Sequence, residues 1–363
     1  MKILYLITKS EAGGAQTHVS DLCNYFAKQN EVVVMAGGDG WLKDECKKNN
    51  IKYFENKYFS NSSNPVRIVK AIKEIKNFVE KFKPDIVHCH SSSAAFLTRL
   101  AIRGKYKTIY TAHGWGFNIG MNPLVRFLVL LTEKINAGYT DKYICVSEFV
   151  KDLALKYKLA GEEKMTVIYN GITSTVDSRQ STVSSKVNLI FVGRLAEPKR
   201  PEMIIEVISN FEKEIQDKIQ FTIVGDGPKR KYLEQLAKEK KVNVFFTGNL
   251  EHGEVMKELS KNDIFVFISA WEGFPYTILE ALSVGLPVIA SNVGGVGEIV
   301  DNTVGRLVEN NAGKISQALL ELINNPELRL KLGKNGMVLV EGKFSLESML
   351  KKTEEVYQNI LNS

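Results

Sequence analysis

Residues 269–300 read SAWEGFPYTILEALSVGLPVIASNVGGVGEIV, and a short apolar run at 264–269 leads into them. The run predicts a buried strand, and Pro275 predicts the first turn of a helix, a position that proline favours. Glu272 lies between the two elements, and Glu280 lies about one and a half turns into the helix. The first backbone N–H groups of such a helix point toward a ligand, and a phosphate or a sugar hydroxyl is a suitable acceptor. The residues expected to face this ligand are Phe274, Pro275, Tyr276 and Thr277.

The two glutamates suggest a sugar-containing ligand. A carboxylate accepts two hydrogen bonds at once, which suits neighbouring hydroxyl groups on one ring. We therefore expect Glu272 and Glu280 to bind two such pairs of hydroxyls, one on a sugar ring and one on a ribose. Two glutamates alone would mean little, but Gly-Phe-Pro between them at a strand-to-helix junction makes the pattern specific.

Outward from this stretch, short apolar runs alternate with longer helical patterns along the whole chain. The runs expected to form strands lie at 2–8, 31–36, 51–55, 85–90, 108–111, 143–146, 166–169, 187–192, 221–224, 243–247, 264–269, 287–290 and 304–308. Nearly continuous apolar strands separated by helices predict parallel sheets that are covered on both faces.

The alternation is interrupted once. Residues 173–185 read TSTVDSRQSTVSS, which has few apolar residues and no periodicity. We therefore predict an α/β protein with two Rossmann-like, doubly wound domains at 1–172 and 187–345, joined by a linker at 173–186. A last helix within 346–363 packs on either domain, and the first is one option. Ligands bind at the carboxyl ends of such sheets, so a cleft between two facing domains is expected.

Composition narrows the class of protein. The chain has 363 residues, of which 44% are hydrophobic and 25% are charged, as in ordinary globular proteins. No apolar run reaches the roughly 18–20 residues of a membrane-spanning helix, and the first residues are typical of a strand and not of a signal peptide. The 4 cysteines are far apart, which predicts neither a disulfide framework nor a zinc site and favours the cytosol.

Charge is unevenly distributed. Residues 1–172 contain 25 Lys and Arg against 16 Asp and Glu, which is +9, and the remainder contains 23 against 25, which is −2. A basic half suggests an anionic partner, either nucleic acid or anionic lipid, although basic residues spread over a solvated surface are the plain alternative. The sequence has no helix-turn-helix and no aromatic-basic RNA motif, so nucleic acid is not expected.

A second motif supplies positive charge. The stretch Gly193-Arg194-Leu-Ala-Glu-Pro-Lys199-Arg200 directly follows the predicted strand 187–192. Arg194 presents a planar fork to phosphate oxygens and Lys199 a compact charge, and both lie where a ligand is expected. Together they could neutralise a diphosphate leaving group without a metal ion, and the sequence has no Asp-x-Asp metal motif.

The first half offers two further candidate positions. Gly13 and Gly14 follow the strand 2–8, and glycines there let a helix N-terminus approach an anion closely, although a tight turn is the simpler alternative. The stretch is not a dinucleotide-binding fingerprint. His113 follows the strand 108–111, where a neutral imidazole could bind a donor sugar or an acceptor. His88 and His90 share one face of a strand, and without a third ligand they do not predict a metal site.

In combination these motifs resemble the retaining glycosyltransferases of family four, which have the GT-B fold of two facing Rossmann domains. The resemblance covers nearly the whole chain. It is carried by Gly13-Gly14, His113-Gly114, Arg194 with Lys199, Val224-Gly-Asp-Gly-Pro228, Gly248, Glu272-Gly-Phe-Pro275, Glu280-Ala281, Gly285-Leu-Pro-Val288 and Gly294-Gly295. The stretch from Thr111 to Phe117 is similar to that of capsule and exopolysaccharide enzymes.

The resemblance implies a role for each motif. Arg194 and Lys199 hold the diphosphate, with Gly193 beside them and Gly14 closing from the first domain. Glu272 holds the donor sugar and Glu280 the ribose, while Asn249 and Leu250 hold the base. The family also implies a UDP-linked donor, no metal cofactor and retention by front-face attack. In that mechanism the departing phosphate oxygen takes the proton of the acceptor hydroxyl.

Alternatives remain within this class of fold. An epimerase acting on a nucleotide sugar needs no acceptor, and a transferase can also act on a small soluble acceptor. The segment 122–137 reads NPLVRFLVLLTEKINA, which favours a buried core helix, with membrane contact as the alternative. A glycan linked to a polyprenyl lipid is an expected acceptor, and the enzyme would then work at the inner face of the cell membrane.

Overall fold

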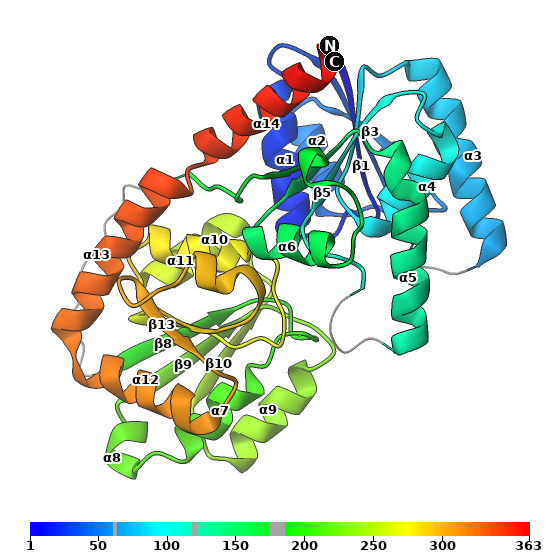
Figure 1. Cartoon of the computed structure of the whole chain (residues 1–363). Coiled ribbons are helices and arrows are strands. Elements are labelled where there is room, and N and C mark those ends of the chain that lie inside the picture. The colour runs from blue at the N-terminus through cyan, green and yellow to red at the C-terminus, as the bar shows by residue number, and fades with distance from the viewer. Residues whose placement is uncertain (61–63, 118–121, 174–185) are drawn as a thin grey trace. The chain divides into compact units, whose positions relative to one another are not determined.

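The computed structural model describes residues 1–60, 64–117, 122–173 and 186–363. The chain forms two compact units (Figure 1). The first comprises Met1–Asn170 together with Met349–Ser363, and the second comprises Gly171–Ser348. Of the predicted linker, residues 174–185 lie outside the described part of the chain.

The first unit is built on a seven-stranded parallel sheet. Its strand order is β3-β2-β1-β4-β5-β6-β7. The strands are β1 (Lys2–Ile7), β2 (Glu31–Ala36), β3 (Lys52–Glu55), β4 (Ile86–Cys89), β5 (Lys107–Ala112), β6 (Lys142–Cys145) and β7 (Met165–Val167). The helices are α1 (Gly14–Phe26), α2 (Trp41–Lys48), α3 (Pro65–Phe82), α4 (Ser92–Ile102), α5 (Pro123–Asn136) and α6 (Glu148–Lys156). Five of the six residues of β1 and of β2 are buried, as helices on both faces require.

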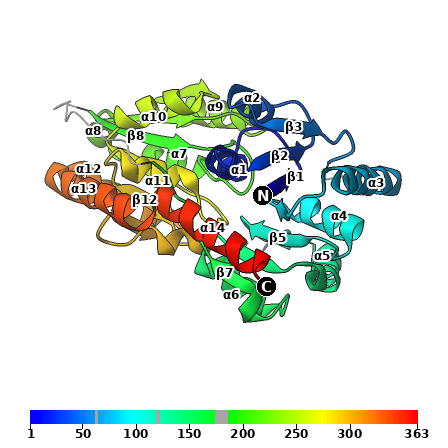
Figure 2. The same ribbon diagram turned by 90° about the horizontal axis from the view of Figure 1, so that it is seen from above.

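The last helix, α14 (Leu346–Leu361), packs on α1 in the first unit (Figure 2). The Tyr25 hydroxyl donates to Glu354 at 2.9 Å, and the Phe26 and Tyr357 rings stack 4.8 Å apart. Because Tyr357 also reaches Tyr5 of β1, the end of the chain completes the core of the unit that begins it.

The second unit contains a six-stranded parallel sheet, in the order β10-β9-β8-β11-β12-β13. The strands are β8 (Val187–Val192), β9 (Ile219–Val224), β10 (Val244–Gly248), β11 (Ile264–Phe267), β12 (Val288–Ser291) and β13 (Gly305–Val308). The helices are α7 (Glu202–Ser209), α8 (Lys213–Gln216), α9 (Arg230–Glu239), α10 (His252–Ser260), α11 (Tyr276–Ser283), α12 (Ala312–Asn324) and α13 (Pro326–Lys343). The predicted pair of doubly wound parallel sheets is therefore confirmed.

Both sheets reverse their strand order at one point. The reversal falls between β1 and β4 in the first sheet and between β8 and β11 in the second. Ligands of doubly wound sheets bind outside the carboxyl ends of the strands at this point. The loops that follow β8 and β11 contain Lys199 and Glu272, so the fold itself brings the two main motifs of the second unit together.

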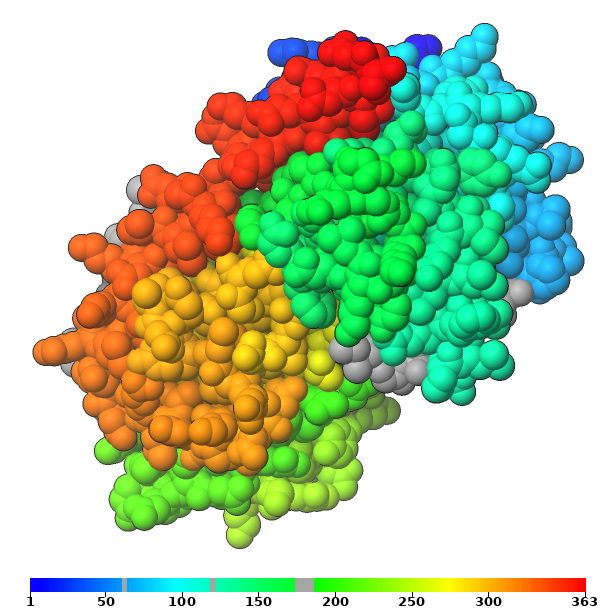
Figure 3. All heavy atoms as spheres, viewed as in Figure 1, coloured from blue at the N-terminus to red at the C-terminus, as the bar shows by residue number. Residues whose placement is uncertain are grey.

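The helix α5 differs from the core helix that its composition favours, and that prediction is wrong. Asn122 accepts hydrogen bonds from the amides of Leu124 and Val125, and Pro123 occupies the first turn, so the helix begins as its sequence suggests. Its buried residues, however, are Glu133 and Asn136. Most of its apolar side chains are exposed instead. The helix lies at the surface of the first unit (Figure 3). The exposed set is Leu124, Val125, Phe127, Leu128, Leu131 and Ile135.

A buried ion pair explains the orientation of α5. The Arg99 side chain of α4 donates to Glu133 at 2.8 Å, and the side chains are only 1% and 5% exposed. Turning the helix to bury its apolar face would expose Glu133 and leave the Arg99 charge buried without a partner. Breaking such a pair costs about 3–5 kcal/mol, which favours the orientation in which Glu133 faces inward.

Candidate active site

The centre of the site in the second unit is an ion pair between Lys199 and Glu272. Lys199 Nζ donates to Glu272 Oε1, and the two side chains are 17% and 10% exposed. The ammonium group also lies over the Phe267 ring, 4.2 Å from its centroid. The backbone of Lys199 pairs with that of Ser269, which joins the loop after β8 to the end of β11. The charge proposed for a phosphate and the carboxylate proposed for a sugar therefore meet in one place.

Glycines shape the loop that contains Arg194. Gly225 has a φ of 127°, and a Cβ there would lie 2.1 Å from the Gly193 carbonyl oxygen. The Leu195 amide donates to the Asp226 carbonyl at 2.9 Å. The loop after β9 thus supports the loop after β8 from behind, with no room for a side chain between them. This packing leaves Arg194 exposed at the carboxyl edge of the sheet.

A further glycine fixes the backbone of Glu272. Gly294 has a φ of 57°, and a Cβ on it would lie 1.8 Å from the Glu272 carbonyl oxygen. That oxygen accepts a hydrogen bond from the Gly295 amide at 3.3 Å. The glycine pair after β12 therefore holds the loop after β11, which explains why the two stretches occur together in the sequence.

The helix α11 begins one residue later than predicted. Pro275 is extended and precedes the first helical residue, Tyr276. Phe274 and Tyr276 are buried and Thr277 is partly exposed, so the two aromatic rings anchor the start of the helix. The first turn contains no acidic residue, which leaves the positive end of the helix suited to an anion.

Glu280 has a partner that the sequence reasoning missed. His252 Nε2 lies 3.2 Å from Glu280 Oε1, and Glu280 is buried while His252 is exposed. His252 is the first residue of α10 and follows Asn249 and Leu250, the predicted base-binding positions after β10. The position of His252, two residues beyond Leu250, could have indicated a role near the base, but nothing in the sequence pairs it with Glu280. The contact between His252 and Glu280 therefore places the predicted ribose-binding residue close to the loop that contains the predicted base-binding positions.

In the first unit, Gly13 and Gly14 lie exposed at the N-terminus of α1, and Gly14 is its first residue. His113 follows β5 and is partly exposed. His113 Nε2 lies 3.4 Å from His90 Nδ1, and the His18 ring stands edge-on to the His113 ring at 4.9 Å. The structure therefore places the predicted His113 in a cluster with His18, His88 and His90. Of the other three, the sequence analysis had grouped only His88 and His90.

Burial keeps this cluster uncharged. Loss of hydration lowers the pKa of His18 to about 4, and it lowers the pKa of His88, His90 and His113 well below the ordinary value, with repulsion among the rings adding to the effect. His88 is fully satisfied, since its two nitrogens contact the hydroxyls of Tyr357 and Thr111 at 2.6 and 2.7 Å. Across the described residues, no group of three or more His, Cys, Asp or Glu side chains is placed to hold a metal ion.

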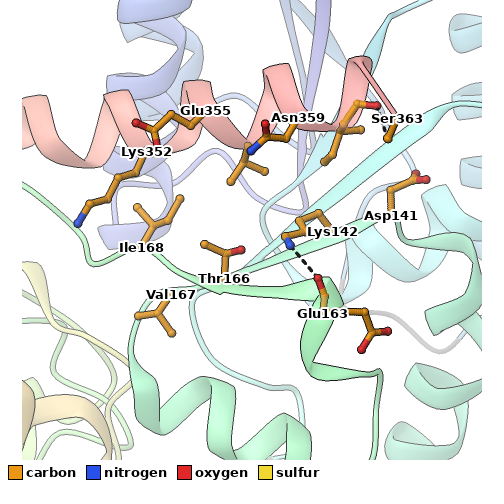
Figure 4. A pocket seen from close by; sticks show the side chains of 12 residues that line it. Asp141, Lys142, Glu163, Thr166, Val167, Ile168, Lys352, Glu355, Asn359 and Ser363 are labelled. Carbon is orange, nitrogen blue, oxygen red and sulfur yellow. Dashed lines mark hydrogen bonds between the residues drawn. The ribbon is translucent and has the colours of Figure 1, made fainter.

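A groove in the first unit lies apart from all of these residues (Figure 4). It has a volume of about 570 Å³ and runs between α14 and the edge strand β7. Lys142, Thr166, Lys352, Glu355 and Asn359 line it, and Lys142 Nζ donates to the Glu163 carbonyl at 2.8 Å. None of the predicted site residues reaches this groove, so it adds nothing to the candidate active site.

Comparison with known proteins identifies the family. Residues 12–175 match the model described as Glycosyltransferase Family 4, and residues 175–338 match that described as Glycosyl transferases group 1. An uncharacterized glycosyltransferase of Methanocaldococcus jannaschii is 30% identical over 81% of this chain and 80% of its own length. The chain is a family-four glycosyltransferase.

Relatives of this glycosyltransferase include enzymes of surface polysaccharides. The O-antigen biosynthesis glycosyltransferase WbnH of Escherichia coli is 27% identical over 95% of both chains. An Escherichia coli enzyme named UDP-Gal:alpha-D-GlcNAc-diphosphoundecaprenol alpha-1,3-galactosyltransferase is 29% identical over 80% of both. The predicted resemblance is thereby confirmed, and the chain is related to O-antigen biosynthesis enzymes.

Solved structures confirm the GT-B fold of this glycosyltransferase. Anabaena HepE in complex with UDP and glucose aligns with a TM-score of 0.83 over 99% of both chains, at 17% identity. WaaG, a glycosyltransferase involved in lipopolysaccharide biosynthesis, aligns with a TM-score of 0.79 over 98% of this chain and 99% of its own, also at 17% identity.

Proposed function

We propose that this glycosyltransferase moves a hexosyl or N-acetylhexosaminyl group from a UDP-linked sugar to a hydroxyl of a lipid-linked glycan, with retention of configuration. The observation that carries the proposal is the joining of Lys199 with Glu272 and of Glu280 with His252 at the carboxyl edge of the second sheet. HepE, which has the same fold, was solved with UDP-glucose, and one Escherichia coli relative is named for a diphosphoundecaprenol acceptor.

Leaving-group stabilisation is the role we assign to the cationic loop. Negative charge develops on the diphosphate as the sugar departs, and a fixed cation in a largely buried position stabilises that charge most strongly. Lys199 meets this condition, and Arg194 adds an exposed guanidinium from the same loop. Two cations replace a metal ion in this scheme, so the enzyme needs no metal cofactor.

Nucleotide binding involves the second pair. Glu280 is buried on α11 and accepts the ribose hydroxyls, while His252 stands beside it at the start of α10. A base held near Asn249 and Leu250 would extend from the ribose along the same edge. His252 then orients the Glu280 carboxylate, and it is the residue that we add to the predicted binding set.

We propose one further sugar-binding residue in each unit. Glu272 accepts from the donor sugar hydroxyls, and His113 of the first unit supplies a neutral imidazole to the sugar. The acceptor hydroxyl attacks from the face that the diphosphate leaves, and the departing phosphate oxygen takes its proton.

The test of the proposed reaction uses the purified full-length chain with a panel of UDP-, GDP- and ADP-sugars and a polyprenyl-diphosphate-linked glycan. We expect turnover with a UDP-sugar, and the NMR coupling constant of the new anomeric proton should match the configuration of the donor. A product of inverted configuration would contradict the front-face mechanism. Conversion of a nucleotide sugar without acceptor would identify the enzyme as an epimerase.

A membrane-bound acceptor is supported by the surface of α5. Leu124, Phe127 and Ile135 are 68%, 60% and 65% exposed, which is unusual for large apolar side chains on one helix. Positive charge lies beside this apolar face. Lys134 is exposed on the same helix. Arg103 and Lys105 are also exposed, on either side of Gly104, which lies close to the Tyr139 ring just beyond the end of α5. We propose that this face docks on an anionic membrane at the inner surface of the cell. In the described parts of the chain, no helix has both the length and the apolar character to cross a bilayer.

Vesicle cosedimentation tests the docking surface. Burying one such side chain contributes on the order of 1.5 kcal/mol, so Phe127→Ser and Leu131→Ser should each weaken binding about tenfold. Leu330→Ser is the matched control, because Leu330 is 54% exposed on α13 of the second unit. Binding should also fall as salt rises, since screening shortens the reach of surface charges. Equal, negligible binding to anionic and neutral vesicles would remove the membrane claim and favour a soluble acceptor.

A further inference from the structure

His90 has one nitrogen in contact with His113 and one without a partner. It follows β4 directly and is 1% exposed. Its Nδ1 lies 3.4 Å from His113 Nε2, whereas its Nε2 is buried with no hydrogen-bond partner among the described residues. A buried, half-satisfied imidazole costs stability, which suggests that its one contact has a purpose.

The two nitrogens in contact permit two arrangements of protons. When both rings are neutral, one nitrogen must donate and the other must accept. If His113 donates from Nε2, His90 carries its own proton on Nε2, and a buried N–H group is left without an acceptor. If His90 donates from Nδ1, its Nε2 is a bare lone pair instead. Buried N–H groups without partners are rarer than buried acceptors without partners, so the second arrangement is favoured.

The favoured arrangement decides what His113 can offer to a ligand. Its Nε2 is occupied as an acceptor, so its proton sits on Nδ1. His113 then presents an N–H donor, which suits a sugar hydroxyl oxygen, and it presents no free lone pair that would take a proton from the acceptor. The tautomer of a histidine is set in this way by the bond that its other nitrogen makes.

We propose that His90 is a positioning residue that holds His113 in the Nδ1–H tautomer and aims its donor at the sugar. This inference rests on the proposed function only in naming the sugar as the ligand of His113. The tautomer itself follows from the contact between the two rings.

The neighbouring rings support the arrangement. The His88 ring lies 4.1 Å from the His90 ring, and the Tyr5 and His18 rings lie at 5.7 and 5.5 Å, so His90 is packed on three sides. His88 already contacts Tyr357 and Thr111, which leaves His113 as the partner of His90. Packing of this kind fixes the His90 ring so that its Nδ1 stays directed at His113.

The first test measures the tautomer in the wild-type chain. Two-bond ¹H–¹⁵N correlation spectra of the ligand-free protein resolve the two ring nitrogens of each of the 5 histidines. The signals of His113 are identified by their loss in His113→Gln. We expect a protonated Nδ1 and an unprotonated Nε2 on His113. An Nε2–H tautomer on His113 would overturn the proposal, whether or not a substrate has been found.

The second test separates positioning from simple packing. In His90→Asn the side-chain amide nitrogen stands near the place of Nδ1 and can still donate, whereas His90→Phe fills the space without a donor. We expect kcat/KM for sugar transfer to fall about tenfold or more in the Phe variant and to be largely restored in the Asn variant. UDP affinity, which depends on the second unit, should be unchanged in both. Equal losses in the two variants would overturn the positioning role and leave His90 as a packing residue.

Discussion

The histidine cluster makes the first unit sensitive to mild acid. Of 5 histidines in the chain, four lie in this cluster, and His18, His88 and His90 are almost fully buried. The pKa of each is lowered in the folded chain, chiefly by loss of hydration. Between the folded and unfolded pKa values the unfolded chain binds more protons, so the free energy of unfolding must fall as the pH falls through that window.

The magnitude follows from His18. The pKa of His18 is about 4 in the folded chain, against the ordinary histidine value of 6.5. At pH 5 the difference in proton binding removes about 2 kcal/mol of stability, and at pH 4 it removes about 3 kcal/mol. His88 and His90 act in the same direction. Because whole domains are stable by only about 5–15 kcal/mol, the first unit should be substantially destabilised at pH 5.

The assay must follow the first unit alone. The chain has 3 tryptophans, and Trp271→Phe leaves Trp41 and Trp115, which both belong to the first unit. Urea unfolding of this variant by fluorescence at pH 7, 6 and 5 should show a steadily falling midpoint. Adding His18→Gln should reduce the dependence of the free energy of unfolding on pH by the contribution of about one proton.

Two results would contradict this reasoning. A midpoint that does not change between pH 7 and 5 would mean that the rings are already protonated or hydrated in the folded chain. A loss that begins only below about pH 4.5 would point to carboxylates such as Glu31 and Glu162, whose pKa values are lowered by hydrogen bonds from lysines and which therefore stabilise the fold above that range.

Other expectations concern the second unit. Arg194→Ala and Lys199→Ala should each reduce sugar transfer about a hundredfold or more without unfolding the chain. EDTA should have no effect on transfer. Loss of turnover on chelation, restored by a divalent metal, would refute the metal-free scheme. Glu272→Gln should slow transfer more than it weakens UDP binding, and Glu280→Gln should weaken UDP binding itself, as calorimetry would show; exchanged effects would reverse the two assignments. Gly294→Ala should displace the Glu272 loop and lower the melting temperature, because its Cβ would overlap the Glu272 carbonyl; an unchanged melting temperature and activity would refute this.

The fold could be predicted from the sequence because its signals are local. The stretch 189–192 within the run 187–192 is apolar throughout, and a strand buried on both faces accounts for that pattern in a chain with helices between the runs. The loop motifs could be placed for the same reason. Arg194 lies just beyond such a run, after Gly193, and the end of a parallel strand defines the binding edge of the sheet.

Contacts between distant residues could not be predicted in this way. His252 and Glu280 are 28 positions apart, and Arg99 and Glu133 are 34 apart on different helices. The composition of α5 indicates a helix with a strong apolar face, but periodicity cannot tell whether that face lies inward or outward. Glu133 favours one orientation, but its partner Arg99 becomes visible only when α4 and α5 are packed together.

If Lys199 binds the diphosphate and Glu272 the sugar, as proposed, their pairing links leaving-group binding to sugar binding. In the structure each group neutralises the other, and neither is well hydrated because both are largely buried. In the proposed reaction, a diphosphate bound by Lys199 would compete with Glu272 for the ammonium group, and the carboxylate would then need further hydrogen-bond donors. The hydroxyls of the donor sugar are such donors, whereas UDP alone supplies none at that position. A complete donor would thus satisfy both groups, whereas free UDP would leave the largely buried carboxylate with fewer hydrogen bonds, which is unfavourable. The same ion pair that keeps the empty site stable would in this way favour the intact nucleotide sugar over the product nucleotide.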